Sequence, residues 1–568
     1  MRNTTRRHVT GTATTHTFGF PALVLLAGIL TVAPAALGAG MTDAVEQYGV
    51  RFVFDRPYMT GTFANGDYWV KTGEDGRVVI TALTPAGDGE HHGWEVNPDH
   101  TGHQGFDKRI GGFRPDRVPA LPYEASAGES IVKTVSVDPN QKRARPALKT
   151  AVVLTVLDDE PPNGGDTVFR PPYFGTKKPF YSVDDLRLEK LPAIDGSGVS
   201  NTPSLAWVED NFRRVWLDHK FHWSGRNMHP KQNLPDYGSG IGRLSGMGAL
   251  RLMLNDPVAA KRQAAINYVQ VGLDLFQMWQ GGLTWPAAGG HMNGRKLPIT
   301  LAGVLLENEE MMRAVRGAGG NVFQEDGSVY YSPTAKMVLW GQPRGGERMY
   351  WLVLCEGRGS KNCRDPYRYI DGGVKPGYSY QACCNSRTWK ATGLCLHLMP
   401  ELRRVWNEEP FLDYLYRWIH FGAWTQPDPY ALTCENPGAK DKNPEDGTGR
   451  FPDLHGVNAD GGGWGSRFAD AMWKKLRPGD AAGMPAIVPY GQEFTDSVRV
   501  TLESSPRTPG CDLRYTLDGS TPSADDALYR EPLELTETTT VKVRATREGL
   551  YDSAVNTVTF TQTEGDGE

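Results

Sequence analysis

The period of the hydrophobic pattern changes twice along this chain, and the changes divide it into three regions. From residue 41 to about 198, short apolar runs such as "RFVFD", "DYWVK" and "RVVITAL" alternate with turn sequences such as "ANGD" and "GEDG". In several runs every second residue is apolar, which indicates β-strands with one buried face. Short strands in series predict an N-terminal β-sandwich over residues 41–198.

The hydrophobic period becomes helical from Leu205 onward. One stripe of "LAWVEDNFRRVWLDHKF" would contain Leu205, Val208, Phe212, Val215 and Trp216. Runs such as "AAKRQAAINYVQVGLDLFQMW", "LPITLAGVLLENEEMMRAV" and "PFLDYLYRWIHFGAW" continue the series. Serial helices joined by long polar loops predict an α/α toroid over residues 199–480, with helix pairs around a central cleft. The chain as a whole is therefore predicted to be a multidomain α+β protein.

The last region, residues 484–563, is strand-like again. Its segments "RYTLDGSTP" and "TTTVKVRATREGLYDS" resemble the small C-terminal β-sandwich module of chitobiases and β-hexosaminidases, and "RYTLDGSTP" is the strongest part of the match. The resemblance covers only this part of the 568 residues. It implies a secreted bacterial carbohydrate-active protein, and it assigns no catalytic residue.

The first 38 residues have the features of a secretory signal peptide. A positive end is formed by Arg2, Arg6 and Arg7. An apolar run from Phe20 to Val32 and the small residues "APAALGAG" follow, so we expect cleavage near Gly38 and a secreted or periplasmic protein. No later segment approaches the ~20 apolar residues that a membrane span requires.

Seven cysteines follow the predicted signal peptide. Export favours disulfides, and the pairs considered are Cys355–Cys363 and either Cys383 or Cys384 with Cys434. Sequence alone does not determine the pairing. No CxxC motif is present, which argues against a thiolate zinc cluster.

Composition and motifs exclude several functional classes. The net charge of -5 gives no basic field for nucleic acid. The chain has no GxGxxG after a strand, no P-loop and no GxSxG, so we expect no nucleotide cofactor and no serine hydrolase. Four histidines in "EHHGWEVNPDHTGH" lack the i,i+4 spacing of a zinc helix, and no metal is expected.

Three polar clusters lie in loops beside predicted helices, where a toroid would gather them around its cleft. Residues 224–238 contain Arg226, Asn227, His229, Asn233, Asp236 and Tyr237. Residues 289–296, "GGHMNGRK", contain His291, Asn293, Arg295 and Lys296. Residues 455–468 contain His455, Asn458, Asp460, Trp464 and Arg467.

These residue types suit β-elimination on a uronate-containing polysaccharide. The reaction requires a group that neutralises the carboxylate, a base for the C5 proton and an acid for the leaving oxygen. We expect Asn227 and Arg295 to neutralise the uronate, His229 or His291 to be the base, and Tyr237 to be the acid. Further substrate contacts are predicted for Arg226, Asn293, Lys296 and Trp464. A cationic helix start at residues 295–296 also favours a bound anion.

The predicted architecture and these residue types are similar to the toroid-type polysaccharide lyases, such as the alginate and heparin lyase families. The resemblance covers roughly residues 41–480 and implies a substrate that is an acidic polysaccharide. Some of those families have adjacent Asn and His residues, whereas Met228 separates Asn227 from His229 here.

Two other functions remain open. An inverting glycoside hydrolase would need two carboxyl groups about 6.5–9.5 Å apart. The candidates are Asp236, Asp371, Asp460 and Glu209. The polar loops are richer in cations and amides than in acids, which favours an anionic substrate. A non-catalytic glycan-binding protein is the second alternative, and exposed Trp or Tyr side chains without a His–Tyr pair in the cleft would support it. Independently of the function, His229 could simply bond a loop carbonyl and Tyr237 could be a packing residue.

Overall fold

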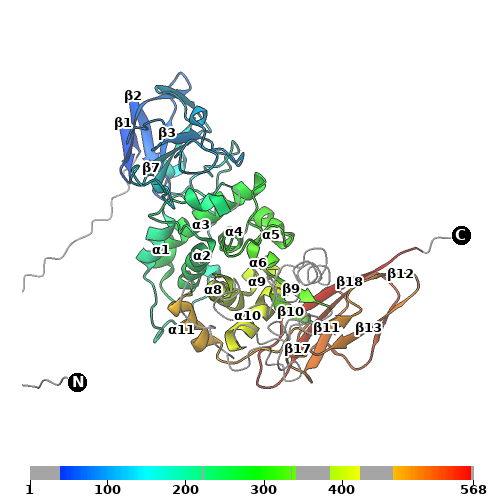
Figure 1. Ribbon diagram of the computed structural model, residues 1–568. Helices are drawn as coiled ribbons and strands as arrows, with labels where there is room; N and C mark the ends of the chain where they lie inside the picture. Colours follow the sequence, from blue (N-terminus) through cyan, green and yellow to red (C-terminus); the bar gives the residue numbers. More distant parts are fainter. Residues whose placement is uncertain (1–38, 221–222, 334–335, 341–383, 422–464, 565–568) are drawn as a thin grey trace, which may run out of the picture. The chain divides into compact units, whose positions relative to one another are not determined.

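The structure is a computed structural model that describes residues 39–220, 223–333, 336–340, 384–421 and 465–564. The predicted signal peptide lies outside the described residues, as do Asp371, Asp460 and Trp464. Helices and strands both contribute, which confirms a mixed α and β protein (Figure 1).

Eight strands form the N-terminal region. They are β1 (Gly40–Gln47), β2 (Val50–Thr62), β3 (Tyr68–Lys71), β4 (Arg77–Thr84), β5 (Trp94–Val96), β6 (Tyr123–Ser126), β7 (Ser130–Ser136) and β8 (Leu148–Leu157). All belong to one hydrogen-bonded sheet in the order β5-β7-β8-β3-β2-β4-β6, with β1 on β2. The sheet has one parallel pair, β3 with β8.

This sheet differs from the predicted two-sheet sandwich. Strands β2 and β7 contact each other although they are not neighbours, as do β6 and β8, so one face encloses a core of its own. The other face joins the helical core, and in β8 Val152 and Leu154 face the first core while Ala151 and Val153 face the second. Alternating apolar residues predict strands with a buried face, but they do not distinguish one curled sheet from two packed sheets.

The connection from the sheet to the helices contains short 3-10 turns. They are η2 (Pro162–Gly165), η3 (Val183–Asp185) and η4 (Leu188–Lys190), and η1 (Pro115–Arg117) lies earlier, between β5 and β6.

The helical region has ten α-helices among the described residues. They are α1 (Leu205–Phe212), α2 (Gly238–Leu252), α3 (Val258–Gln280), α4 (Lys296–Leu305), α5 (Glu309–Arg316), α6 (Gln324–Gly327), α8 (Ser386–Leu398), α9 (Pro400–Trp406), α10 (Glu409–Phe421) and α11 (Arg467–Leu476). A 3-10 turn, η5 (Trp223–Asn227), precedes α2, and a hairpin of β9 (Val329–Ser332) and β10 (Met337–Trp340) follows α6.

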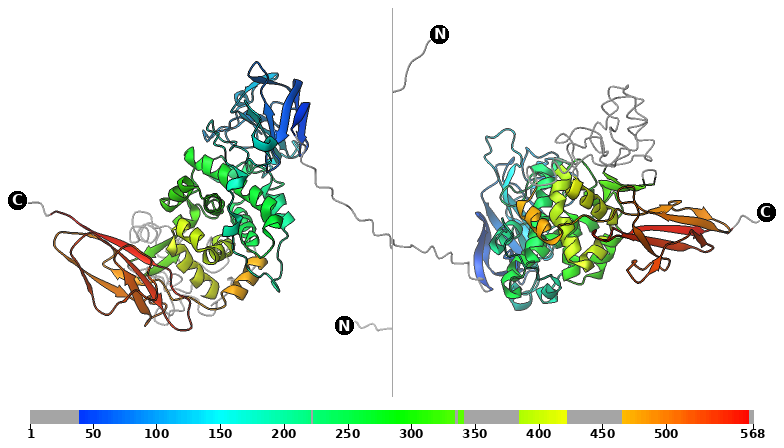
Figure 2. Two further views of the ribbon diagram at one scale, coloured as in Figure 1. Left: turned by 180° about the vertical axis from the view of Figure 1, so that it is seen from behind. Right: turned by 90° about the horizontal axis from the view of Figure 1, so that it is seen from below.

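Helix α2 packs against α1, α3, α4, α8 and α11, near the centre of the helical region (Figures 1 and 2).

Two of the predicted helices are shorter than expected. Helix α1 ends at Phe212. The run that begins "LPITLAG" forms α4 and α5, because Glu307 has a φ of 50° and the Asn308 side chain caps α5. A closed toroid stays a prediction, since residues 341–383 and 422–464 lie outside the described part.

The C-terminal region has two sheets that share one core. Strands β11 (Ala486–Val488), β13 (Val498–Glu503) and β16 (Leu533–Leu535) form the first sheet. The second consists of β12 (Glu493–Phe494), β18 (Asn556–Gln562), β17 (Thr539–Thr546), β14 (Asp512–Thr516) and β15 (Ala527–Leu528). Val500 of the first sheet and Val543 and Phe560 of the second are fully buried in this core. Buried and half-buried residues alternate strictly along β17, because successive side chains of a strand point to opposite faces of the sheet.

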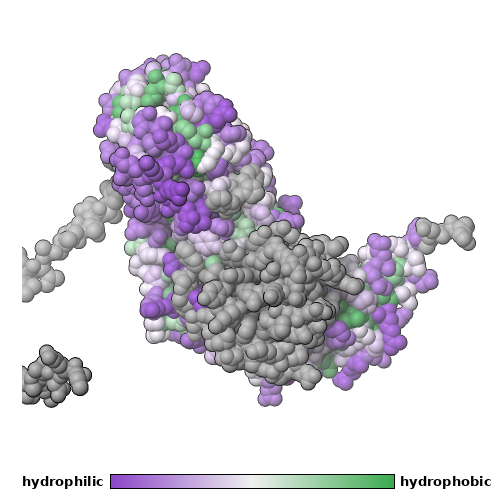
Figure 3. All heavy atoms as spheres, in the orientation of Figure 1, coloured by the Kyte–Doolittle hydropathy of each residue, from purple (hydrophilic) through white to green (hydrophobic). Residues whose placement is uncertain are grey.

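Within the described residues, no helix is both long and apolar enough to cross a membrane. Hydrophilic residues cover much of the coloured surface in Figure 3.

Candidate active site

Two of the predicted polar loops meet at a narrow cavity of about 280 Å³, open solvent included, in which about 10 Å³ is wide enough for the centre of a water molecule. The side chains therefore leave room for about one water. It is lined by Asp218, Lys220, Gly225, Arg226, His229, Thr284, Trp285, His291, Met292 and Arg295. Four predicted site residues, Arg226, His229, His291 and Arg295, are therefore brought together. Trp464 of the third cluster lies outside the described residues.

Glycines allow the second loop to lie directly on helix α2. A Cβ on Gly238, the first residue of α2, would lie only 2.0 Å from the carbonyl oxygen of His291. Gly294 has a φ of 93°, and a Cβ there would lie 2.4 Å from the backbone nitrogen of Gly242. Side chains at these positions would push His291 away from the first loop.

Helix α6 fixes the second loop with three consecutive side chains. The Gln324 Oε1 atom accepts a hydrogen bond from the Met292 N–H at 2.8 Å, and the Glu325 Oε1 atom accepts one from the Gly294 N–H at 2.6 Å. Asp326 pairs with the Lys296 ammonium at 2.7 Å. These three hydrogen-bonding residues were not predicted from the sequence, because nothing local connects "QED" at 324–326 to the loop.

The two cations at the start of α4 have internal counterions. The Arg295 Nε and Nη2 atoms donate to the two carboxylate oxygens of Asp218 at 2.7 and 2.9 Å. The Lys296 Nζ atom bonds Asp326 and the carbonyl of Trp406. Arg295 and Lys296 are 2% and 1% exposed, so the anions that the cationic helix start predicts are carboxylates of the chain itself.

The two asparagines are placed away from the cavity lining. The Asn293 amide nitrogen donates to the Asn385 Oδ1 atom at 2.7 Å, and the Asn293 Oδ1 atom accepts from the Trp389 indole at 3.0 Å. Asn293 is completely buried. The Asn227 carbonyl accepts from the Ala147 N–H at 2.8 Å. The polar groups of Asn293 hold the loop to α8 and are not accessible to a ligand.

His229 has partners for both ring nitrogens. Its Nε2 atom lies 2.9 Å from the Asp218 Oδ1 atom, and its Nδ1 atom lies 2.7 Å from the carbonyl oxygen of Pro235. Burial favours protonation of Asp218, but the Arg295 charge and the hydrogen bonds from His229 and Arg295 outweigh it and hold the Asp218 pKa well below its usual value. His229 therefore supports the ion pair between Asp218 and Arg295, and neither of its ring nitrogens is free to remove a proton from a substrate.

His291 is in the opposite situation. Its ring is half-buried, its Nδ1 atom is shielded from solvent and has no hydrogen-bond partner, and it packs edge-on against Tyr237 with 4.7 Å between ring centroids. Burial, followed by the positive charges of Arg226 and Arg295, lowers the pKa of His291 to about 4. The imidazole is therefore neutral at pH 7 and able to accept a proton.

Tyr237 connects both loops. It is the residue before α2, and its hydroxyl accepts a hydrogen bond from the Gly290 N–H at 3.1 Å. The Arg226 guanidinium lies 5.1 Å from the centre of the Tyr237 ring. Arg226 and Arg145 both bond the Asp236 carboxylate, at 2.8 and 3.0 Å.

Few carboxylates are available for an acid–base pair. Among the described residues that line the cavity, Asp218 is the sole carboxylate, and it is ion-paired. Glu209 lies on α1, away from the lining, and Asp236 is held by its two arginines. Asp371 and Asp460 lie outside the described residues.

The histidine-rich loop does not assemble a metal site. The His91 Nδ1 atom bonds Asp88 at 2.9 Å, and the His92 Nδ1 atom accepts from the Ser136 N–H at 3.2 Å. The described part of the chain contains no group of three His, Cys, Asp or Glu side chains that could hold a metal ion.

Two described cysteines, Cys395 and Cys511, are buried free thiols. Each disulfide considered from the sequence involves at least one cysteine outside the described residues, so the pairing stays a prediction.

Comparison with known proteins relates the C-terminal region to one family. Residues 489–557 match the model of the chitobiase/beta-hexosaminidase C-terminal domain. No curated protein matches the chain. The match confirms the resemblance carried by "RYTLDGSTP" and indicates a glycan-related protein, but it includes none of the residues around His291. Through residues 489–557, the chain is thus similar to carbohydrate-active proteins.

Proposed function

We propose that this chain is an exported enzyme, secreted or periplasmic, that cleaves an acidic, uronate-containing polysaccharide by β-elimination. The observation that carries the proposal is a neutral histidine with an unpartnered nitrogen, placed against a tyrosine and surrounded by arginines. The glycan-related module at residues 489–557 supports a polysaccharide as the substrate.

His291 is the proposed base. A base must be unprotonated at the working pH, and burial, followed by the neighbouring cations, lowers the pKa of His291 and keeps it neutral. The same cations would withdraw charge from a uronate carboxylate and so make its C5 proton more acidic. His229 is not proposed for this step, because both of its ring nitrogens are occupied.

Arg226 and Lys220 are the proposed carboxylate-binding groups, in place of Arg295. Both line the cavity, and the Lys220 ammonium bonds the carbonyl of Gly102. The Arg295 guanidinium is fully occupied, because Nε and Nη2 bond Asp218 and Nη1 bonds the carbonyls of His291 and Asn293. A substrate carboxylate would compete with Asp236 for Arg226. Tyr237 is 9% exposed and is not among the residues that line the cavity, but its ring packs against Arg226 and His291. It is the proposed acid that protonates the leaving glycosidic oxygen.

The activity test uses the purified protein with alginate, glucuronan, pectate, ulvan and glycosaminoglycans. Reducing ends and ultraviolet absorbance are followed together. We expect both to rise with one substrate, since β-elimination leaves an unsaturated uronyl end. New reducing ends without absorbance would mean hydrolysis and would overturn the lyase proposal.

The base assignment is tested with His291→Ala on the substrate so identified. We expect turnover to fall by about 10²- to 10⁴-fold with an unchanged melting temperature. His103→Ala is the matched control, because His103 is an exposed histidine outside the cavity. A folded His291→Ala variant with wild-type turnover would show that another group is the base.

A further inference from the structure

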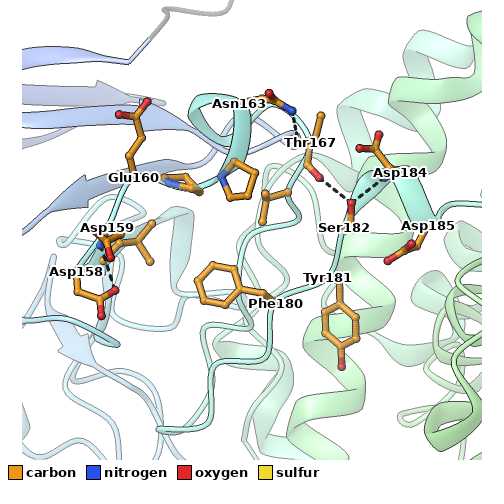
Figure 4. A pocket seen from close by; sticks show the side chains of 14 residues that line it. Asp158, Asp159, Glu160, Asn163, Thr167, Phe180, Tyr181, Ser182, Asp184 and Asp185 are labelled. Carbon is orange, nitrogen blue, oxygen red and sulfur yellow. Dashed lines mark hydrogen bonds between the residues drawn. The ribbon is translucent and has the colours of Figure 1, made fainter.

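A second and larger cavity lies where strand β8 ends. It measures about 1140 Å³, open solvent included. The 14 residues that line it come from the segments 157–163, 167–168 and 180–185 (Figure 4). We call it the Phe180 groove. None of its residues lines the His291 cavity.

The apolar residues at the base of the groove pack against buried aromatic side chains. Leu157 and Val168 line it, and both belong to a small apolar cluster with the buried Phe63 and Trp69. The Trp69 indole donates a hydrogen bond to the carbonyl of Gly164 at 3.0 Å, which ties the loop between β8 and residue 168 to the sheet. The groove is therefore a preformed surface, as ligand sites usually are.

The groove contains one aromatic side chain, Phe180, that is exposed to solvent. Phe180 is 57% exposed, although aromatic rings are normally buried. Figure 4 shows it between the Asp158–Asp159 side and the Asp184–Asp185 side of the groove. The flat apolar face of a sugar ring packs well against such a side chain, and the carboxylates on both sides can bond its substituents.

The charge of the groove is entirely negative. Its carboxylates are Asp158, Asp159, Glu160, Asp184 and Asp185. No lysine or arginine is found among the described residues that line it. One partner is Lys71, which lies 3.3 Å from Asp159 in an ion pair that leaves the Asp159 side chain 88% exposed. A surface of this kind attracts cations and repels anions.

We propose that the Phe180 groove binds a cationic amino-sugar oligomer, with a sugar face on Phe180 and its ammonium groups on the flanking carboxylates. A neutral sugar would add no counterion for the groove's carboxylates, of which Asp159 has one in Lys71, and an acidic sugar would be repelled. A metal ion is a poor occupant, because these carboxylates do not form a group of three close enough to hold one. The glycan-related module at residues 489–557 favours a sugar over a basic peptide.

Binding is measured by titration calorimetry on the full chain. The probes are a glucosamine tetramer with free amines, its fully N-acetylated counterpart and tetralysine. We expect saturable binding of the glucosamine tetramer that weakens with added salt, and no binding of the acetylated tetramer. Equal binding of the acetylated tetramer, or displacement by an equal concentration of tetralysine, would overturn the proposal.

Two variants locate the site. Phe180→Ala should weaken binding about tenfold by removing the platform. The double variant Asp184→Asn, Asp185→Asn should weaken it about three- to tenfold. All three side chains are exposed, so both variants should keep the wild-type melting temperature.

The matched controls are Leu517→Ala, an exposed apolar residue, and the double variant Glu531→Gln, Glu548→Gln, which removes the same charge from the C-terminal region. Both should bind as the wild type does. Unchanged affinity in the two groove variants, or an equal loss in the controls, would show that the tetramer binds elsewhere. Activity of the His291 cavity does not enter this test, so the two proposals fail separately.

Discussion

The His291 cavity and the Phe180 groove both contain several charged side chains. In the cavity two of them form a buried ion pair, whereas in the groove they are exposed to solvent. In the cavity, Arg295 and Asp218 pair with each other, and both are almost completely buried. In the groove, Asp184 and Asp185 are exposed, and no cation is among the described lining residues. A cluster of charges therefore indicates an external ligand only when its counterions are not found elsewhere in the same chain.

The counterions of Arg295 and Lys296 lie far away in the sequence, which is why the local sequence suggested an external anion. The partner of Arg295 is 77 residues away, and the partner of Lys296 is 30 residues away. In "GGHMNGRK" the cations have no acidic neighbour, so an external anion is the natural interpretation. The fold instead provides both carboxylates and leaves His291 as the residue of this stretch that keeps an unbonded polar atom.

The largest effect is expected from Asp218→Asn. The variant leaves Arg295 buried without a counterion, and removing one partner of a buried pair costs about 3–5 kcal/mol of unfolding free energy. Urea unfolding followed by fluorescence measures this loss. Asp195→Asn is the control, because its ion pair with Lys475 is on the surface and should contribute nothing measurable. Equal stability of the two variants would mean that the cavity charges are no more coupled than surface charges.

The next largest effect is the pH dependence of stability that Glu325 of helix α6 causes. Burial raises the pKa of Glu325 from 4.5 to about 7, so the native state retains a proton that the unfolded chain releases. The stability that Glu325 contributes is present below about pH 4.5 and is lost as the pH rises through 7. Glu325→Gln stays neutral and keeps an oxygen for the Gly294 N–H. It should therefore become more stable than wild type as the pH rises, by on the order of 3 kcal/mol.

This measurement compares unfolding free energies of the two proteins from pH 4.5 to 8. His291 has the opposite slope, since its lowered pKa removes stability as the pH falls from 6.5 to about 4. That slope is common to both proteins and cancels in the difference. A difference that stays constant with pH would mean that Glu325 is ionised in the folded protein.

Local patterns predicted the elements better than their assembly. The runs "RVVITAL" and "TAVVLTVL" form β4 and β8, and "RYTLDGSTP" identified the C-terminal module, because strand alternation and a motif are read from adjacent residues. The curl of the N-terminal sheet depends on contacts between strands far apart in the chain, such as β2 and β7. No pattern within a single strand encodes such contacts.

The candidate site shows the same limit. Its loops and residue types were found from the sequence, and the structure brings His291 and Tyr237 into contact. The sequence did not separate His229 from His291, although one is fully bonded and the other is not. That difference depends on Asp218 and on the carbonyl of Pro235, which a polar loop does not reveal. Phe180 was missed because a single exposed phenylalanine has no sequence signature.

The smallest effect is expected from the exposed carboxylates of the groove. The double variant Asp184→Asn, Asp185→Asn removes two exposed carboxylates that form no ion pair within the described part of the chain, although Arg187 bonds the Asp184 carbonyl. Its unfolding free energy should therefore stay within about 0.5 kcal/mol of wild type. Any change should be a gain at low salt that disappears at high salt, because like charges repel less when screened. Urea unfolding at two salt concentrations tests this. A clear loss of stability would mean that these carboxylates support the fold, as Asp218 does, and would make them unavailable to a cationic ligand.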